Sequence, residues 1–395
     1  MQSEFDKIKN LPPYVFAEVN KLKDAKRAAG FDIIDLGMGN PDIPTPKHIV
    51  DKMIETSLAP NTHRYSASKG IPGLRKAIAG YYGRRFGVDI DPNTEAVVSI
   101  GSKEGLANLA QAISTPEDSF LVPNPSYPIH AFGFKIAGAS VIDLPMYTGK
   151  TIQQQVVEEI ENCKKTGRKK PLALVLNYPG NPTADVATLD FYEEMVDLCR
   201  FHGIYIISDL AYCEIYFDEP TPSILQVKGA KDICVEFTTM SKTYSMPGWR
   251  VGFCVGNKEL VNALTRIKSY LDYGVFTPIQ VASAYALNGP QDCVEDIRRI
   301  YKSRRDVLVE GMAAAGWPIE APKASMFAWA QIPEKFRHLG SVEFAKLLME
   351  EAEIAVSPGI GFGVHGDGHV RISLVENKQR IRQATRNLKK FIASY

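Results

Sequence analysis

Lys242 is the residue whose setting most clearly indicates chemistry. It lies in a polar turn between two apolar runs, 233–237 and 251–255, and Arg250 follows eight residues later. Both runs have the composition of buried strands, which places the lysine at a strand end, where functional side chains gather in α/β proteins. Its amine attacks a carbonyl only when unprotonated, so burial or the charge of Arg250 must lower its pKa. The pattern is typical of a lysine that forms a Schiff base beside a phosphate anchor, whereas a lone lysine in a turn is usually solvated.

The segment 100–105 has the composition of an anion site. It follows a strand-like run and opens a helix whose apolar positions 106, 109, 110 and 113 share one face. The free N–H groups and the dipole at such a helix start attract a phosphate, and the Ser102 hydroxyl adds a donor. The alternative is an ordinary helix start that Ser102 caps.

Two more polar groups follow apolar runs. The segment 177–183 holds two prolines and a glycine, which predict a rigid turn that presents the Asn181 amide. Asp209 follows the run 204–208, and Tyr212 comes three residues later. A carboxylate in this setting needs a cationic or hydrogen-bonding partner. Taken singly, the first segment also fits a plain turn, and Asp209 also fits a helix cap.

The elements that must position these side chains alternate along the chain. Between residues 48 and 289, short β-branched runs alternate with helical periodicity, which predicts a large domain with a mostly parallel sheet. Residues 1–47 and 290–395 are predicted to form a smaller α+β domain with an N-terminal arm. Helices are predicted over 291–315, which would link the domains, and over 342–352 and 378–394. The predicted strands are 96–100, 119–122, 172–176, 204–208, 233–237, 251–255, 326–332 and 369–374.

Eight motifs occur in the order that class I/II aminotransferases share, and the chain resembles that family over nearly its whole length. Segments 11–20 and 38–42 are most similar to its bacterial alanine-type branch, which lies near diaminopimelate-type enzymes. The resemblance implies an α/β fold of the fold type I group of pyridoxal-phosphate-dependent transferases, with pyridoxal 5'-phosphate as cofactor. The motifs are 37–42, 65–73, 101–105, 124–128, 181–183, 209–212, 241–242 and 370–373.

The resemblance implies that Lys242, Asp209 and Tyr212 are catalytic. Lys242 would bind the cofactor covalently and carry the proton between the substrate Cα and the cofactor. Asp209 would keep the pyridine nitrogen protonated, while Tyr212 and Asn181 would hydrogen-bond the phenolic oxygen. Tyr127 would stack on the ring, at a position where many relatives have tryptophan.

The other implied contacts hold the substrate and the phosphate. Arg371 would grip the substrate α-carboxylate, close to Asn181 and the backbone of Gly39. On sequence alone Arg371 also fits an ordinary strand charge. Tyr65 would reach the phosphate from a second subunit, which requires a homodimer. The phosphate contacts within one chain would be Ser102, Lys103, Thr239 and Arg250.

The expected function is an aminotransferase that works by a ping-pong mechanism, with an alanine-like donor and 2-oxoglutarate as the favoured acceptor. Alternatives are a diaminopimelate- or methionine-type aminotransferase, or a carbon–sulfur lyase or decarboxylase on the same fold. In the resembled family, dicarboxylate-specialised members place a second arginine, which comes from the partner chain, near the position of segment 268–276. Here that segment has aromatic residues and no arginine, which favours a small neutral donor. A transcription regulator with this fold would need an added DNA-binding module and a basic excess.

Composition argues against other partners. Lys and Arg total 46 against 45 acidic residues, so nothing indicates nucleic acid or an anionic membrane. The chain has no N-terminal apolar region and no apolar run of spanning length, which predicts a cytoplasmic protein. Its six cysteines include no Cys-x-x-Cys pair, so no disulfide framework is expected. His365 and His369 bracket Asp367, but the segment is too rich in glycine to predict a metal site.

Overall fold

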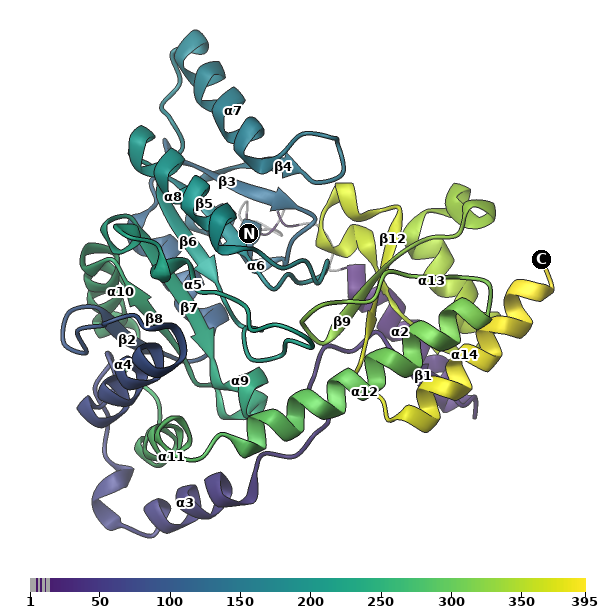
Figure 1. Cartoon of the computed structure of the whole chain (residues 1–395), viewed down its shortest axis with the longest axis horizontal. Coiled ribbons are helices and arrows are strands. Elements are labelled where there is room, and N and C mark those ends of the chain that lie inside the picture. The colour runs from purple at the N-terminus through teal and green to yellow at the C-terminus, as the bar shows by residue number, and fades with distance from the viewer. Residues whose placement is uncertain (1–4, 6–7, 9–10, 12–14) are drawn as a thin grey trace.

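In the part of the chain that the structure describes, the strands form one sheet of seven strands, one sheet of three strands and one separate pair. The structure is a computed structural model that describes residues 5, 8, 11 and 15–395 (Figure 1). The N-terminal arm and the motif at 11–20 therefore lie partly outside the described residues.

The seven-stranded sheet is mostly parallel, as predicted. Its order is β2-β8-β7-β6-β5-β3-β4, and β8 runs antiparallel to both of its neighbours while the other pairs are parallel. The strands are β2 (Ala96–Ser99), β3 (Ser119–Asn124), β4 (Ser140–Pro145), β5 (Ala173–Asn177), β6 (Tyr205–Asp209), β7 (Cys234–Thr239) and β8 (Gly252–Gly256).

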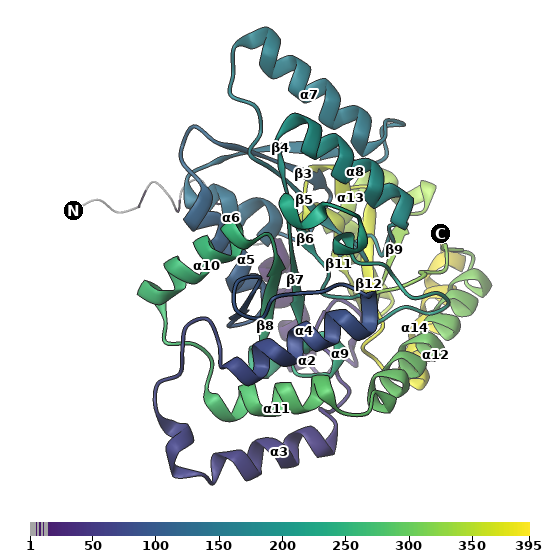
Figure 2. The same cartoon turned by 60° about the vertical axis from the view of Figure 1, so that its left-hand side comes forward.

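Helices cover both faces of this sheet (Figure 2). Successive strand residues point to opposite faces, so Leu174 and Leu176 of β5 enter one hydrophobic core while Ala173 and Val175 enter another. Burial on both faces explains why these strands read as continuous apolar runs. The helices of this part of the chain, of which α3 packs on α11 and α9 is a single turn, are α3 (Lys47–Ser57), α4 (Pro72–Phe86), α5 (Ser102–Ile113), α6 (Ile129–Ala137), α7 (Ile152–Thr166), α8 (Leu189–His202), α9 (Met240–Thr243), α10 (Lys258–Leu271) and α11 (Thr277–Asn288).

The three-stranded sheet is antiparallel, in the order β11-β12-β9, and β1 pairs in parallel with β10. The long helix α12 (Asp292–Ala314) connects this region to the large sheet, because Val294 lies in a core of the large sheet and Ile297 in the core of the small one (Figure 1). The other elements are α2 (Val15–Ala28), β1 (Ile34–Asp35), β9 (Phe327–Gln331), α13 (Gly340–Glu351), β10 (Ile354–Ala355), β11 (Ser357–Pro358), β12 (His369–Ser373) and α14 (Lys378–Ala393).

Each predicted strand and helix has a counterpart whose ends agree within two residues. The prediction omitted β4, an edge strand whose residues are mostly exposed or half-buried and so lack an apolar run. It also omitted β1, β10 and β11, which are two residues each and too short to show a period. The division of the chain at residues 48 and 289 stays a proposal.

Two properties of the described residues concern membranes and metals. Within 15–395, no helix has the length and hydropathy needed to cross a bilayer. No three His, Cys, Asp or Glu side chains of that range converge as metal ligands. At the His365–His369 segment, Asp367 accepts hydrogen bonds from the N–H and hydroxyl of Ser341 at 2.9 and 2.7 Å, and the His369 ring stacks on Trp329 with centroids 5.0 Å apart.

Candidate active site

A cavity of about 390 Å³ lies at the carboxyl ends of β5, β6 and β7, where β9, β11 and β12 of the small sheet face them. Ligands of α/β proteins bind in such a crevice. Eleven of the twelve predicted site residues line the cavity, and Tyr65 does not. The eleven are Gly39, Ser102, Lys103, Tyr127, Asn181, Asp209, Tyr212, Thr239, Lys242, Arg250 and Arg371.

Lys242 projects into the cavity from α9, the single helical turn that follows β7. Thr239 starts this turn, because its Oγ1 accepts a hydrogen bond from the Ser241 N–H at 3.1 Å. The Lys242 Nζ donates to the carbonyl oxygen of Gly39 at 3.0 Å. Burial, and then repulsion by Arg371 and Arg250, lowers the pKa of Lys242 from 10.5 to about 7. The amine is therefore available as a nucleophile near neutral pH, and the charge of Arg250 is the smallest of the three causes.

Asp209 ends β6 beside Asn177, which ends β5. Its Oδ2 lies 2.9 Å from Nε2 of His130, and its Oδ1 accepts the Ala211 N–H at 3.1 Å. His130 belongs to α6 and is 1% exposed, so it fixes the orientation of the carboxylate from the protein side. A partner for Asp209 could be predicted from its apolar setting in the sequence, but not its identity as His130, which lies 79 residues earlier in the chain.

Asn181 connects two other predicted residues. Its Nδ2 donates to the Tyr212 hydroxyl at 3.4 Å, and its Oδ1 accepts from Arg371 Nη1 at 2.8 Å. The turn that carries it is held by Asn177, whose Oδ1 accepts the Asn181 N–H at 2.9 Å. Burial raises the pKa of Tyr212, so the phenol keeps its proton and can donate it in a hydrogen bond.

Arg371 is 7% exposed and is held in β12 by contacts to both of its Nη atoms. Its Nη2 donates to the Gly37 carbonyl at 3.1 Å and to the Ser357 hydroxyl at 3.3 Å. The guanidinium lies over the ring of Phe327, 4.0 Å from its centroid. A Cβ on Gly39 would lie 3.3 Å from Arg371 Nη2, so glycine keeps this approach open. A planar guanidinium held in this way can receive a carboxylate with two hydrogen bonds.

The other end of the cavity is built to hold an anion. Ser102 and Lys103 open α5, whose first N–H groups have no partner within the helix. Arg250 adopts a left-handed φ of 57°, and its side chain packs so closely on Gly101 that a Cβ at Gly101 would overlap the guanidinium. The start of α5 and the guanidinium of Arg250 are therefore adjacent, which is the arrangement that a phosphate site requires.

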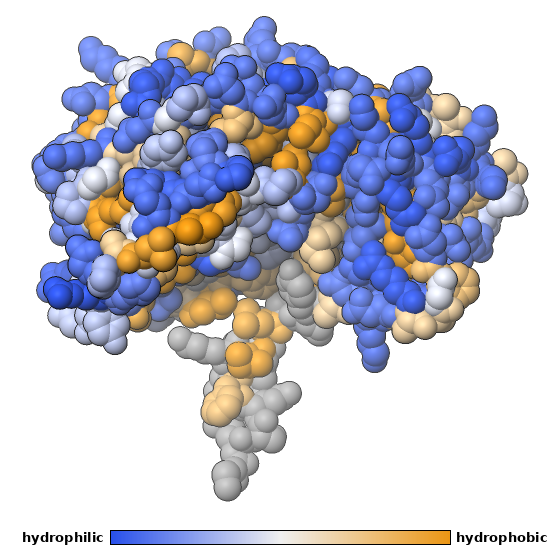
Figure 3. Space-filling model, turned by 90° about the horizontal axis from the view of Figure 1, so that it is seen from below, coloured by the Kyte–Doolittle hydropathy of each residue, from blue (hydrophilic) through white to orange (hydrophobic). Residues whose placement is uncertain are grey.

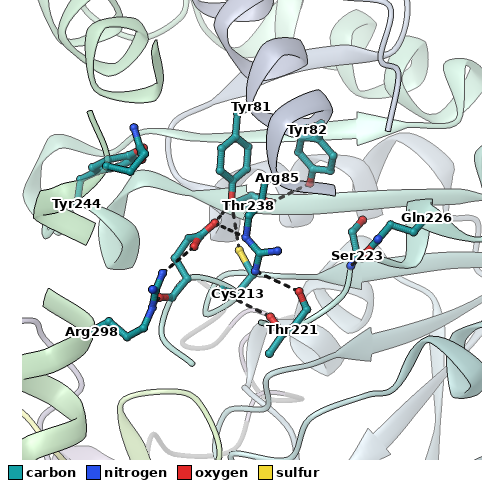
Figure 4. A network of polar contacts seen from close by, with 12 residues as sticks. Tyr81, Tyr82, Arg85, Cys213, Thr221, Ser223, Gln226, Thr238, Tyr244 and Arg298 are labelled. Carbon is teal, nitrogen blue, oxygen red and sulfur yellow. Dashed lines mark hydrogen bonds and ion pairs between the residues drawn. The ribbon is translucent and has the colours of Figure 1, made fainter. Parts of the chain in front are cut away.

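A buried ion-pair network holds the loop that follows Asp209 and Tyr212 (Figure 4). Glu214 Oε1 accepts from the Tyr81 hydroxyl at 2.6 Å and from Arg85 Nε at 3.1 Å. Its Oε2 lies 3.3 Å from Nη2 of Arg298 in α12. Removing one partner would leave a buried charge uncompensated, so the network fixes the loop against α4 and α12. Cys213 lies within it, 3.5 Å from the Tyr81 hydroxyl, and burial raises the pKa of its thiol.

Tyr65 lies outside the cavity of its own chain. The residue is 87% exposed, and its ring centroid is 4.7 Å from that of Tyr273. Tyr270, Tyr273 and Phe276 are also exposed, at 84%, 64% and 42%. Hydrophobic side chains reach the surface elsewhere too, as in the patches on the face seen from below (Figure 3).

Comparison with known proteins gives a consistent picture. Residues 32–388 match the family "Aminotransferase class I and II". The chain is 60% identical to a putative aminotransferase, AatC, of Rhizobium meliloti, covering 99% of this chain and 96% of that protein. It is 53% identical to the glutamate-pyruvate aminotransferase AlaC of Escherichia coli, covering 98% and 93%. It is 39% identical to an LL-diaminopimelate aminotransferase of Moorella thermoacetica, covering 98% of each. The solved structure of substrate-bound BacF from Bacillus subtilis has a TM-score of 0.90 and 36% identity, covering 99% of this chain and 98% of that one.

The chain belongs to the class I and II aminotransferase family and has its fold type I architecture. It is an enzyme, and members of the family use pyridoxal 5'-phosphate. The cavity fits this cofactor. Lys242 offers an amine of lowered pKa, the start of α5 with Arg250 offers an anion site, and Asp209 presents a buried carboxylate to the same cavity.

Proposed function

We propose that the protein transfers the amino group of a small neutral L-amino acid, alanine in the first place, to 2-oxoglutarate. The amino-acid and 2-oxo-acid chemistry follows from the family. The observation that carries the choice of substrates is the 53% identity to a glutamate-pyruvate aminotransferase over nearly the whole chain. Both steps of such a ping-pong reaction would use the same cavity.

Pyridoxal 5'-phosphate, when bound, supplies an aldehyde that takes up amino groups and a ring that withdraws electrons from the substrate α-carbon. We assign the ring nitrogen to Asp209, the phenolic oxygen to Asn181 and Tyr212, and one ring face to Tyr127. Ser102, Lys103, Thr239 and Arg250 would bind the phosphate. Their places around the cavity support this assignment.

Lys242 and Arg371 would act on the substrate itself. Arg371 would bind the α-carboxylate, with Asn181 and Gly39 beside it, and so orient the α-carbon toward Lys242. The Lys242 amine, with a pKa near 7, would remove the α-proton and return it. A group with a pKa close to the working pH does both steps efficiently.

The preference for a neutral donor rests on the cations around the cavity. Lys268, in the segment near which dicarboxylate-specialised relatives place an arginine, is fully buried, does not line the cavity and lies 2.7 Å from Asp272 Oδ2. Lys23 lines the cavity but is paired with Asp35 at 2.7 Å. The short side chain of aspartate would leave its second carboxylate unpaired in the desolvated pocket, at a cost of several kcal/mol, which is more than about a hundredfold in kcat/KM. Glutamate and 2-oxoglutarate are dicarboxylates too, but their longer chain would carry the second carboxylate farther from the reacting carbon, to water, an amide or another cation.

We further propose a cytoplasmic homodimer in which Tyr65 contacts the cofactor phosphate of the partner chain. Tyr65 is exposed and outside its own cavity, beside the exposed ring of Tyr273, which is the arrangement expected of a residue that a second copy covers. All six cysteines are free thiols, which suits a reducing compartment.

An LL-diaminopimelate-type aminotransferase is the second candidate, favoured by relatives with that activity at 39% to 41% identity. A donor screen at fixed 2-oxoglutarate decides between the two. We expect L-alanine to exceed LL-diaminopimelate, methionine and aspartate in kcat/KM. If aspartate exceeds alanine, the argument from the missing cation is wrong. If LL-diaminopimelate leads, the second candidate is right.

A further inference from the structure

A buried ion pair contacts the turn at residues 37–39, whose carbonyl oxygens accept hydrogen bonds from both Arg371 and Lys242. Lys23 of α2 and Asp35 at the end of β1 are 5% and 8% exposed, and Lys23 Nζ lies 2.7 Å from Asp35 Oδ2. Lys23 Nζ also donates to Asn20 Oδ1 at 3.1 Å. Both charged residues line the cavity, although none of the roles assigned above uses them.

Asp35 directs its second oxygen to the turn. Its Oδ1 accepts the N–H groups of Gly37 and Met38 at 3.1 and 3.2 Å. A carboxylate held by a lysine on one side and two backbone N–H groups on the other has a fixed orientation. Residues 37–39 are therefore fixed with it.

The same turn presents two carbonyl oxygens to the functional cations. The carbonyl of Gly37 accepts from Arg371 Nη2 at 3.1 Å and from the Ser357 hydroxyl at 2.8 Å. The carbonyl of Gly39 accepts from Lys242 Nζ at 3.0 Å. A continuous series of contacts thus leads from Lys23 through Asp35 and the turn to Arg371.

We propose that Lys23 and Asp35 are positioning residues that hold Arg371 ready for the substrate carboxylate through the turn at 37–39. The proposal rests on the proposed function, in which Arg371 binds that carboxylate. Without Lys23, the nearest cation to Asp35 is Arg27, whose Nη2 lies 3.8 Å from Asp35 Oδ2 on the more exposed side of α2. The carboxylate would turn toward Arg27 and release the N–H groups of the turn, so the Gly37 carbonyl would no longer be fixed against Arg371.

The test measures carboxylate binding apart from catalysis. Propionate, which has no amino group to transfer, is titrated calorimetrically into the purified holoenzyme. Arg371→Met should abolish binding. Lys23→Met and Asp35→Ala, the second of which removes the acceptor of the turn's N–H groups, should each weaken it about tenfold, the value of one hydrogen bond to a charged group. Lys21→Met, at an exposed position of the same helix, should bind as the wild type does. For alanine, KM should rise about as much in the two positioning variants, with kcat changed less than about twofold.

A pair that only docks α2 would lower the melting temperature and leave propionate affinity unchanged. Wild-type affinity in Lys23→Met and Asp35→Ala therefore overturns the proposal, as does wild-type affinity in Arg371→Met. If Lys23→Met does not fold because Asp35 is left unpaired, the double variant Lys23→Met with Asp35→Ala removes both charges and must still bind more weakly. A wild type that binds propionate through Arg371 but transaminates no donor refutes the proposed function, while the affinities still decide the positioning role.

Discussion

Lys242 should react as an amine that is about half unprotonated at pH 7, and Arg371 should be part of the reason. With a pKa of about 7 instead of 10.5, about half of the amine is neutral at pH 7, compared with roughly one molecule in three thousand for an ordinary lysine. In Arg371→Met the pKa of Lys242 should rise by no more than half of the difference between 10.5 and 7, because burial is the larger cause of the lowered pKa and remains in the variant.

The assay is competitive acetylation of the cofactor-free protein between pH 6 and 11, with a lysine peptide as internal standard and mass spectrometry of the peptide that contains Lys242. We expect a midpoint near pH 7 for the wild type and a higher midpoint for Arg371→Met. Lys21→Met, at an exposed position of α2 that does not line the cavity, should leave the midpoint of Lys242 unchanged. A wild-type midpoint above about pH 9.5 would refute the argument from burial, since an exposed lysine titrates there. An unchanged midpoint in Arg371→Met would refute the role given to charge repulsion.

Three further predictions concern the residues around Lys242. Asp209→Asn should lower kcat by several orders of magnitude, with a smaller loss of cofactor affinity. The amide can still accept a hydrogen bond from His130, but it carries no charge to pair with the ring nitrogen of the cofactor. A near-normal kcat in steady-state assays would show that Asp209 has another role. His130→Phe should lower kcat about 10- to 100-fold by freeing the Asp209 carboxylate, while His130→Asn, which can still hydrogen-bond it, should recover part of the loss in the same assay. In mixed dimers of inactive Lys242→Ala chains and impaired Tyr65→Ala chains, activity should return toward half of the wild-type value, because one of the two sites then has both residues intact. If activity does not recover after subunit exchange is confirmed, the site is not shared between subunits.

The apolar strands and the polar groups at their ends could be predicted because both leave local signals. The sequence placed Asn181 and Asp209 each after a strand-like run. That the two strands are parallel neighbours in register, which brings both residues to one cavity, is seen only in the structure. The resemblance to a family then supplied Arg371 and Tyr127, whose own segments carried no sign of chemistry.

Contacts between distant segments could not be predicted in this way. His130 reaches Asp209 from a helix 79 residues earlier, and Glu214 meets Arg85 and Arg298 from two other helices. Asp35 belongs to a strand of two residues, which is too short to show a period, and its pairing with Lys23 depends on how α2 packs. Such partners are decided by tertiary packing, for which a single sequence has no local pattern.

The most direct measurement of the central claim is a single turnover without an amino acceptor. Purified holoenzyme mixed with excess L-alanine should release one pyruvate per active site and then stop, because the amino group stays on the enzyme. Addition of 2-oxoglutarate should restart pyruvate release and form an equal amount of L-glutamate. Lys242→Ala, treated in the same way, should give no steady turnover. Continuous pyruvate release without an acceptor would contradict an aminotransferase. So would a failure to release the corresponding 2-oxo acid from alanine and from every other amino acid tested in its place.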